Sequence, residues 1–247
     1  NPSAQYPAGL EMKKRVEGWR ASVAALLDCP AEGLYFTSCG TEGDNWAIRA
    51  ALCQNRRVGK HIVTTAVEHS AVLQCVKQLE REGYAVSYVK PDREGRITAR
   101  SVLEAVREDT ALVSVMLVNN ETGAVFPVPE IAAGLKNRPA LLHTDAVQGF
   151  LKIPFTVKSL GADYVTLSAH KIGGPKGIGA LYIGGRAKNT LPLLYGGGQE
   201  NGLRPGTEAT AQMAGVARAV ELRLERQEET AAHLAACRDY ARERLSA

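Results

Sequence analysis

Residues 162–175 read ADYVTLSAHKIGGP, and this stretch decides which fold the rest of the chain is expected to adopt. The segment 162–167 is rich in apolar and β-branched residues, which is typical of a strand buried in a sheet. Lys171 follows closely, with Ser168 and His170 beside it and a Gly-rich turn after it. Since glycine lets a bulky ligand approach the backbone, we expect the strand end to hold the Lys171 amine rigidly in a crevice.

A second apolar run, 140–144, ends directly before Asp145. A lysine can form an imine with an aldehyde, and an aspartate can hold a protonated pyridine nitrogen. These two groups are the protein's share of pyridoxal 5'-phosphate (PLP) chemistry. Lys171 and Asp145 at two strand ends therefore predict a PLP enzyme.

Short apolar or β-branched segments alternate with helical patterns along most of the chain. Most of these short segments are typical of strands that are buried on both faces. The alternation predicts an α/β fold with a mostly parallel, doubly wound sheet and flanking helices. The expected strands are 34–37, 61–64, 85–89, 111–117, 141–143, 164–167 and 179–183, and the expected helices are 42–53, 70–82, 98–107 and 129–135.

Helical patterns also occupy both ends of the sequence. One covers 11–27, and the other runs almost unbroken over 207–245, which is longer than the usual globular helix. We expect the second helix to connect to a further unit or to pack on a partner.

The composition is that of an ordinary soluble protein. Apolar residues make up 45% of the 247 residues and charged residues 23%, with a net charge of +4. Arg56, Arg57 and Lys60 form a basic cluster that favours a solvated loop over a nucleic-acid site. No apolar run approaches the ~20 residues that span a bilayer, and 1–5 lack the features of a signal peptide. We therefore predict a cytoplasmic protein that binds neither nucleic acid nor membrane.

The cysteines give no sign of a disulfide framework or a zinc site. They are odd in number, scattered and never arranged as Cys-x-x-Cys. The histidines form no pair at helical spacing either, so we predict no metal. The five cysteines are Cys29, Cys39, Cys53, Cys75 and Cys237.

Two segments near the N-terminal side suit the same ligand. In 36–45, the Gly40 backbone and the Thr41 hydroxyl could bind a phosphate, because helix N-termini bind anions; the alternative is that Thr41 is an ordinary N-cap. In 66–70, the His69 ring could stack on a planar cofactor; the alternative is a capping loop with an incidental histidine.

Two later segments add polar groups. The amides of Asn119 and Asn120 favour a turn, and they also suit a ring hydroxyl or a substrate carboxylate. The loop 196–207 is either a linker or a segment that reaches a phosphate across a dimer interface. All of these segments except the last loop follow a predicted strand, and ligands in open α/β sheets bind beyond the carboxyl ends of the strands. We therefore predict one shared pocket.

Eight short motifs span nearly the whole chain. They are NPS at 1–3, TSCGTE at 37–42, VEH at 67–69, NNETG at 119–123, HTDAVQ at 143–148, SAHK at 168–171, GPKGIG at 174–179 and RPGTE at 204–208. In this order they resemble the cysteine desulfurases of the NifS/IscS type, within the class V, fold-type I PLP enzymes. The motifs are highly specific for the fold and the cofactor and fairly specific for the desulfurase branch.

The resemblance implies a role for each matched residue. It implies that Lys171 bonds covalently to the cofactor, that His69 stacks on the ring and that Asp145 pairs with the ring nitrogen. It makes Cys39 part of the cofactor loop rather than a sulfur acceptor. The other implied contacts are Asn120 and Gln148 near the phenolic oxygen, and Gly40, Thr41, Ser168, His170 and, from the other subunit, Thr207 at the phosphate.

The resemblance also shows where this chain departs from the family. Family members have a strand and turn before the position of Asn1 and a smaller domain after the long helix. That domain supplies a loop with the nucleophilic cysteine and an arginine that grips the substrate carboxylate, and no cysteine here matches that position. Pro205 stands where relatives commonly carry a small residue. We expect 1–247 to be the PLP-binding large domain, with 207–245 leading into the small domain, and to be inactive alone.

The implied function is that of a PLP-dependent cysteine desulfurase, which converts L-cysteine to L-alanine and an enzyme-bound persulfide. It implies a homodimer that passes sulfur to an acceptor such as an iron–sulfur scaffold protein. One alternative is a selenocysteine lyase or another class V aminotransferase-like enzyme, which the loop cysteine would distinguish. The other is a non-catalytic scaffold, which has no need of Lys171, Asp145 and His69 together.

Overall fold

A computed structural model describes residues 1–246 and contains one seven-stranded sheet in the order β1-β7-β6-β5-β4-β2-β3. Strand β7 runs antiparallel to both of its neighbours, whereas the pairs among β6, β5, β4, β2 and β3 are parallel. The predicted mostly parallel α/β sheet is therefore confirmed. The strands are β1 (Leu34–Thr37), β2 (His61–Thr65), β3 (Ala85–Val89), β4 (Thr110–Ser114), β5 (Leu141–Asp145), β6 (Tyr164–Ser168) and β7 (Gly179–Ile183).

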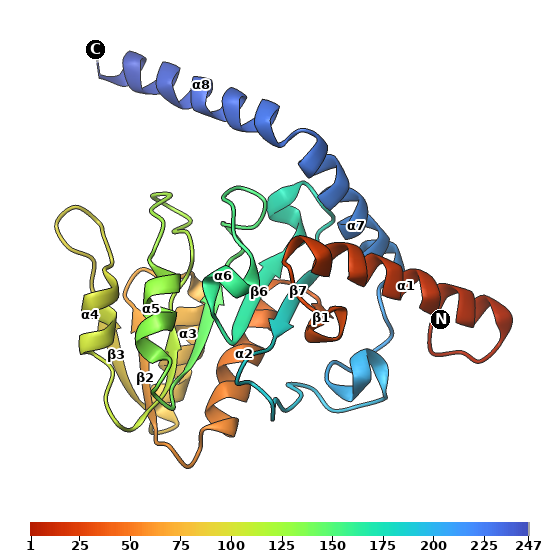
Figure 1. Ribbon diagram of the computed structural model, residues 1–247, viewed down its shortest axis with the longest axis horizontal. Helices are drawn as coiled ribbons and strands as arrows, with labels where there is room; N and C mark the ends of the chain where they lie inside the picture. Colours follow the sequence, from red (N-terminus) through yellow and green to blue (C-terminus); the bar gives the residue numbers. More distant parts are fainter. Residues whose placement is uncertain (247) are drawn as a thin grey trace.

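Helices flank both faces of the sheet (Figure 1). Consecutive residues of a strand point to opposite faces, so Ile62 packs in the core that contains Trp46 of α2, and Val63 packs in the core that contains Val23 of α1. The helices are α1 (Pro7–Leu26), α2 (Gly40–Gln54), α3 (Ser70–Arg81), α4 (Ala99–Glu104), α5 (Val128–Leu135), α6 (Val157–Leu160), α7 (Thr210–Glu225) and α8 (Gln227–Leu245), with short 3-10 turns η1 (Ala31–Gly33), η2 (Ala169–Ile172) and η3 (Gln199–Gly202).

Strand β4 ends earlier than the sequence pattern predicts. The apolar run continues to Leu117, but the strand stops at Ser114. The backbone N–H of Met116 is taken by the buried carboxyl group of Glu68, at 3.0 Å from each oxygen, instead of by a strand neighbour. The expected strand 111–117 is thus too long, because periodicity cannot reveal a side chain that replaces a strand partner.

Two other expectations are corrected. Helix α4 covers Ala99–Glu104, shorter than the expected 98–107. Strand β3 is not buried on both faces, because it forms one edge of the sheet and Ala85 is exposed.

The long helical segment near the C-terminus is two helices and not one. Arg226, with φ −116° and ψ 19°, leaves the helical region and separates α7 from α8. Helix α7 packs along α1, whereas α8 has no buried residue and extends away from the sheet (Figure 1). Among residues 1–246, no helix combines the length and the apolar character needed to cross a membrane.

Candidate functional site

A cavity of about 380 Å³ lies beyond the carboxyl ends of the parallel strands, where ligands bind in open α/β sheets. It brings together nine of the ten predicted site residues, from five segments of the chain; Thr207 does not line it. The lining residues are Cys39, Gly40, Thr41, Asp44, His69, Met116, Asn120, Glu121, Asp145, Val147, Gln148, Ser168, His170 and Lys171.

One end of the cavity is formed by the first turn of α2. Cys39 is the N-cap and its side chain does not cap the helix, so the alternative that Thr41 is the N-cap is wrong. The first amide groups of a helix have no partner within it, and together with the helix dipole they attract anions. A Cβ atom on Gly40 would lie 3.0 Å from Val147, so a larger residue would crowd this turn.

Ser168 and His170 complete this end of the cavity. The Ser168 hydroxyl and Nδ1 of His170 lie 2.9 Å apart. Burial and then the positive charges of Lys171, Lys176 and Lys152 lower the pKa of His170. A neutral imidazole, a hydroxyl and a helix N-terminus make a site for a phosphate group.

Lys171 lies in η2, directly after β6, and its side chain is exposed. The turn after it is made possible by Gly173, whose φ of 84° is in the left-handed region. Lys152 is a second amine nearby: burial and the charge of Lys171 lower the pKa of Lys152. Two amines at one strand end make this part of the cavity positively charged, which suits a phosphorylated aldehyde.

His69 has two roles at once. It is the N-cap of α3, and its Nδ1 accepts a hydrogen bond from the Ala71 amide at 3.1 Å. The capping role is thus correct, but the histidine is not incidental, because the ring lines the cavity. The cap fixes the ring plane against rotation, which is what stacking on a planar ligand requires.

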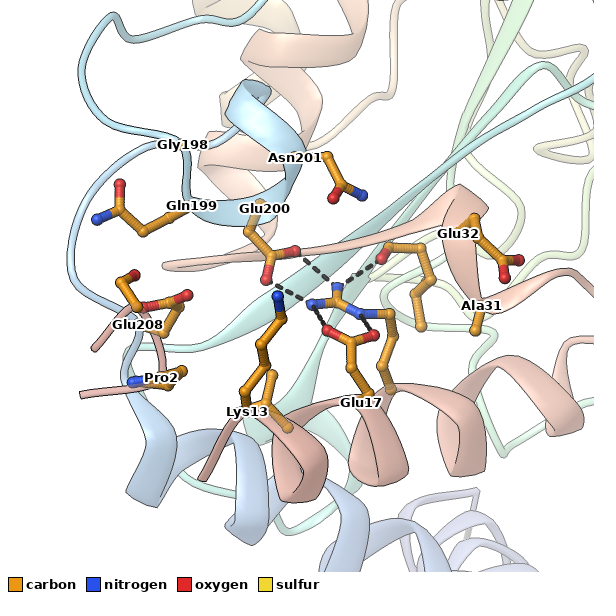
Figure 2. A pocket seen from close by; sticks show the side chains of 14 residues that line it. Pro2, Lys13, Glu17, Ala31, Glu32, Gly198, Gln199, Glu200, Asn201 and Glu208 are labelled. Carbon is orange, nitrogen blue, oxygen red and sulfur yellow. Dashed lines mark hydrogen bonds and ion pairs between the residues drawn. The ribbon is translucent and has the colours of Figure 1, made fainter. Parts of the chain in front are cut away.

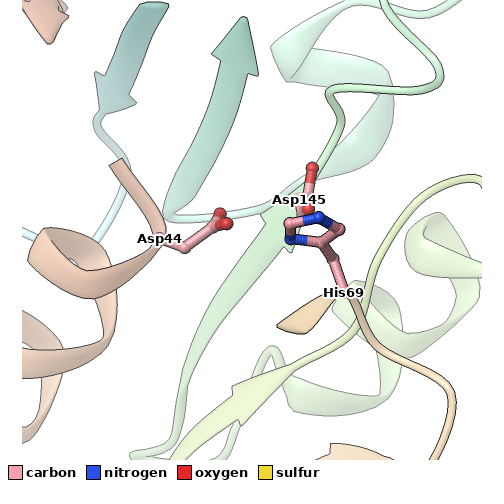
Figure 3. A group of neighbouring side chains, drawn as sticks. All are labelled: Asp44, His69 and Asp145. Carbon is pink, nitrogen blue, oxygen red and sulfur yellow. The ribbon is translucent and has the colours of Figure 1, made fainter. Parts of the chain in front are cut away.

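Asp145 ends β5 beneath the His69 ring (Figure 3). Its Oδ1 accepts the Val147 N–H at 2.9 Å. Burial raises the pKa of Asp145 to about 7, and the charge of Asp44 adds to this effect. A buried carboxylate without a fixed cation is a good partner for a cationic N–H group of a ligand.

Sequence reasoning missed Asp44. This residue lies one turn after Thr41 on α2, is 1% exposed and lines the same cavity. Asp44, His69 and Asp145 each offer one oxygen or nitrogen atom that could bind a metal, and these three atoms lie within 4.8 Å of one another (Figure 3). Three such groups could hold a metal ion, so the prediction that the chain binds no metal stays a prediction. The signal in the sequence was a charged residue on a helix face shared with the apolar residues Ala47 and Ile48.

Sequence reasoning also missed Glu68 and His143, which lie buried under the cavity. Glu68 accepts hydrogen bonds from the Thr65 hydroxyl and the Met116 amide. Burial raises the pKa of Glu68 to about 8 and lowers that of His143 to about 4. Met116, Ser114 and Thr166, which bond these two side chains, lie 23 to 48 positions away in the sequence, so the short motifs that contain Glu68 and His143 did not show that both are buried.

The two neighbouring amides have different roles. Asn119 is buried, donates to the Val67 carbonyl at 2.9 Å and accepts from the amides of Glu121 and Thr122, so it holds the turn. The suggestion that Asn119 meets a ligand is therefore not supported. Asn120 is exposed and lines the cavity.

Gln148 lies on the β5 side of the cavity. Its Oε1 accepts from Lys152 Nζ at 2.6 Å. This contact fixes the amide beside Asp145, at the position where the resemblance expects a contact to the phenolic oxygen.

Thr207 is exposed and belongs to the loop that leads into α7. The loop is fixed by two ion pairs. Glu42 accepts from Arg204, and the buried Arg20–Glu200 pair has N–O distances of 2.7 Å (Figure 2). The second pair borders a separate polar cavity of about 480 Å³ that contains none of the predicted residues.

The residues present fit PLP by three independent features. Helix α2 offers an anion site, His69 offers a ring face, and Asp145, at 6% exposure, offers buried carboxylate oxygens. Such an oxygen is costly to bury unless a proton or a ligand group compensates it. A planar cationic ring with a phosphate satisfies all three.

Comparisons with known proteins identify the family of the chain. The profile of the aminotransferase class V family matches residues 1–247. A cysteine desulfurase of Nostoc sp. is 47% identical over 224 residues, covering 91% of this chain and 56% of that protein. The putative cysteine desulfurase IscS 1 of Bacillus subtilis is 43% identical over 229 residues, covering 93% and 60%. The chain thus spans little more than half the length of the curated relatives it matches.

Solved structures of related proteins share the fold of this chain. A NifS-like protein matches with a TM-score of 0.92 at 39% identity, over 97% of this chain and 66% of that one. The protein SspA, solved in complex with cysteine, matches with a TM-score of 0.85 at 37% identity, over 90% of this chain and 64% of that one.

Proposed function

This chain belongs to the aminotransferase class V family, and from that premise we propose that it is the PLP-binding large domain of a cysteine desulfurase. Class V aminotransferases and cysteine desulfurases are PLP enzymes. The observation that carries the proposal is the cavity itself, in which Lys171, Asp145 and His69 meet an anion site. The similarity to cysteine desulfurases over nine tenths of this chain supports the choice of substrate.

The chain's own residues divide the binding of PLP among them. The first turn of α2 and the Ser168–His170 pair hold the phosphate end. The His69 ring covers one face of the pyridine ring, and the Asp145 carboxylate accepts the ring N–H. Asn120 and Gln148 lie beside the phenolic oxygen. Each group is fixed by its own neighbours, so the ring is oriented before any substrate arrives.

Lys171 has two tasks. Its amine would hold the cofactor through the cofactor aldehyde, and the same amine would move a proton at the α-carbon of a bound substrate. When bound, PLP supplies the electron sink for the negative charge that develops at that carbon.

The sulfur of L-cysteine has to be received by a thiolate. Burial raises the pKa of Cys29 and Cys75 to about 11, so neither thiol is ionised at neutral pH. Cys39 lines the cavity at its phosphate end, where a persulfide would crowd the cofactor. We therefore propose that the nucleophilic cysteine is outside residues 1–247, in the part of the relatives that this chain does not match.

We further propose a homodimer with L-cysteine as substrate and a sulfur acceptor such as an iron–sulfur scaffold protein. Thr207 carries the dimer proposal, because it is exposed on the loop before α7 and does not line its own cavity. Sedimentation of the PLP-loaded chain tests it. A monomer that holds PLP as tightly as a dimer does would contradict a shared site.

The function is tested by the position of the cofactor bond. The chain is incubated with PLP, reduced with borohydride and mapped by peptide mass spectrometry. We expect the pyridoxyl group on Lys171, its loss in Lys171→Ala, and no effect of Lys176→Ala, which removes a neighbouring amine outside the cavity. A label on another lysine would overturn the assignment. L-cysteine and L-selenocysteine are then added separately to the PLP-loaded chain. The change in visible absorbance with each one compares how the two substrates react with the bound cofactor.

A further inference from the structure

The carboxyl group of Asp44 is a feature that the binding scheme above leaves unused. It lies under the cavity between α2 and the ends of β5 and β6, with Oδ1 3.4 Å from Nε2 of His143. It faces Asp145 and His69 across less than 4.8 Å (Figure 3). No residue among 1–246 donates a hydrogen bond to Oδ1.

We propose that Asp44 is a positioning residue at the ring-nitrogen end of the site: it stays a neutral carboxylic acid and thereby leaves the negative charge on Asp145 alone. The inference rests on the proposed PLP site for its role, although the protonation of Asp44 can be measured without the cofactor.

Two carboxyl groups this close in a buried site do not both ionise, because the second negative charge meets the first in a poorly solvated space. The group with the better donors keeps the charge. Asp145 accepts the Val147 amide and borders the open cavity at 6% exposure, whereas Asp44 is 1% exposed. Asp44 is therefore the group that holds the proton.

The other titratable groups nearby supply no cation that would keep Asp44 ionised. His143 is fully buried and bonded on both sides, Nδ1 to Ser114 and Nε2 to Thr166, and burial holds its pKa near 4. The remaining titratable groups close by are Glu68 and Cys75, both with a pKa raised by burial, and the His69 ring. Burial likewise raises the pKa of Asp44 to about 7.

A neutral Asp44 changes what the cavity selects. A single carboxylate beside the His69 ring matches a ligand with one positive charge, such as a protonated pyridine. Two ionised carboxylates with an imidazole would instead favour a divalent metal ion. Whether Asp44 is protonated therefore decides which ligand the cavity favours, a protonated pyridine or a divalent metal ion.

Infrared spectroscopy measures the proposed state directly. Chain labelled with ¹³C only at the aspartate carboxyl groups should show, at about pH 6, a shifted carbonyl band of a protonated acid, because this pH is below the raised pKa of Asp44 and above the ordinary range of exposed aspartates. We expect the band to disappear in Asp44→Asn and to remain in Glu68→Gln, whose own acid is unlabelled. A band that survives Asp44→Asn, or that is missing in the unmodified chain, would overturn the proposal.

The second readout follows the absorbance of bound PLP against pH. In the unmodified chain, Asp44 ionises as the pH rises. The new negative charge beside the ring then changes the absorbance spectrum of bound PLP. Asp44→Asn mimics the neutral acid at every pH, so we expect that transition to vanish while the PLP dissociation constant stays within about threefold. A persistent transition, or a loss of affinity of more than about tenfold, would show that Asp44 acts otherwise.

Zn²⁺ is the third probe. If the PLP-free chain bound Zn²⁺ in competition with PLP, and Asp44→Asn did not, the cluster would be a metal site and the proposal wrong. If the unmodified chain bound no PLP at all, the proposed function would fail, while the infrared band would still decide the state of Asp44.

Discussion

Glu42 and Arg204 are joined by two hydrogen bonds, of 2.8 Å from Nε to Oε1 and of 3.1 Å from Nη2 to Oε2. Glu42 follows Thr41 in the first turn of α2, and Oε2 also accepts the Ser38 amide at 2.7 Å. Burial alone would raise the pKa of Glu42, but Arg204 and Ser38 lower it. The loop that carries Thr207 is therefore fastened to the turn that we propose binds the phosphate.

Arg204→Gln should weaken PLP binding without unfolding the chain. The pair is only 22% and 13% exposed and is bidentate, so its loss frees both the loop and the turn. We expect an increase of about tenfold in the PLP dissociation constant, measured by fluorescence titration. Arg218→Gln is the matched control, because Arg218 pairs with Glu221 on the exposed face of α7. Equal effects of the two variants would show that the loop is not coupled to the site.

Glu68→Gln should make the stability of the PLP-free chain depend differently on pH. Burial raises the folded-state pKa of Glu68 to about 8, above its ordinary value. The folded chain thus holds an extra proton between these two pH values, and its stability falls as pH rises through that window. Because glutamine does not titrate, Glu68→Gln removes this contribution to the pH dependence of stability.

The stability gain of Glu68→Gln over the unmodified chain should therefore be small near pH 4.5 and grow towards pH 8 by no more than about 1.4 kcal/mol per pH unit. Urea unfolding at several pH values measures it. A gain that shrank with rising pH would mean that Glu68 is ionised in the folded chain.

Gly43→Ala should disturb the floor of the site. A Cβ atom at this position would lie 2.8 Å from Cγ2 of Thr166, the residue that bonds His143. We expect a loss of about 1–3 kcal/mol in the free energy of unfolding, typical of overpacking. Gly18→Ala on α1, where the added atom meets nothing within 4 Å, should instead stabilise by up to about 1 kcal/mol. Denaturant unfolding of both variants checks the contrast.

Cys39→Ser should leave PLP binding intact. Cys39 lines the phosphate end of the cavity, but its side chain does not cap α2. We expect a change of less than about threefold in the PLP dissociation constant and no change in persulfide formation from L-cysteine in a longer chain that carries the nucleophile. Sulfide release that disappeared only in this variant would identify Cys39 as the sulfur acceptor after all.

Local sequence patterns predicted much of the fold and most of the site. An apolar run in the sequence predicted each strand, and polar residues at or just after the ends of several strands predicted the cavity, as for Asp145 at the end of β5 and Lys171 three residues after β6. These features need only neighbours in the sequence, so a single sequence contains them.

The features that sequence reasoning missed all depend on distant contacts. Asp44 and Glu68 look like ordinary charged residues, and only the assembled sheet shows that they are buried together. The early end of β4 results from a contact between Glu68 and Met116, 48 positions apart. The break at Arg226 lies inside a continuous helical pattern, so the pattern alone predicted one helix.

The position of β7 also has a consequence for the order of folding. Strand β1 joins the sheet at its edge through β7, with Thr37 opposite Gly179, although β1 is the first of these seven strands in the sequence. The consecutive parallel units from β2 to β6 can pair as they are synthesised, whereas β1 must wait for more than half of the chain. The turn that follows β1, where we propose that the phosphate binds, is therefore the last part of the cavity to be placed, and the cavity is completed late in synthesis.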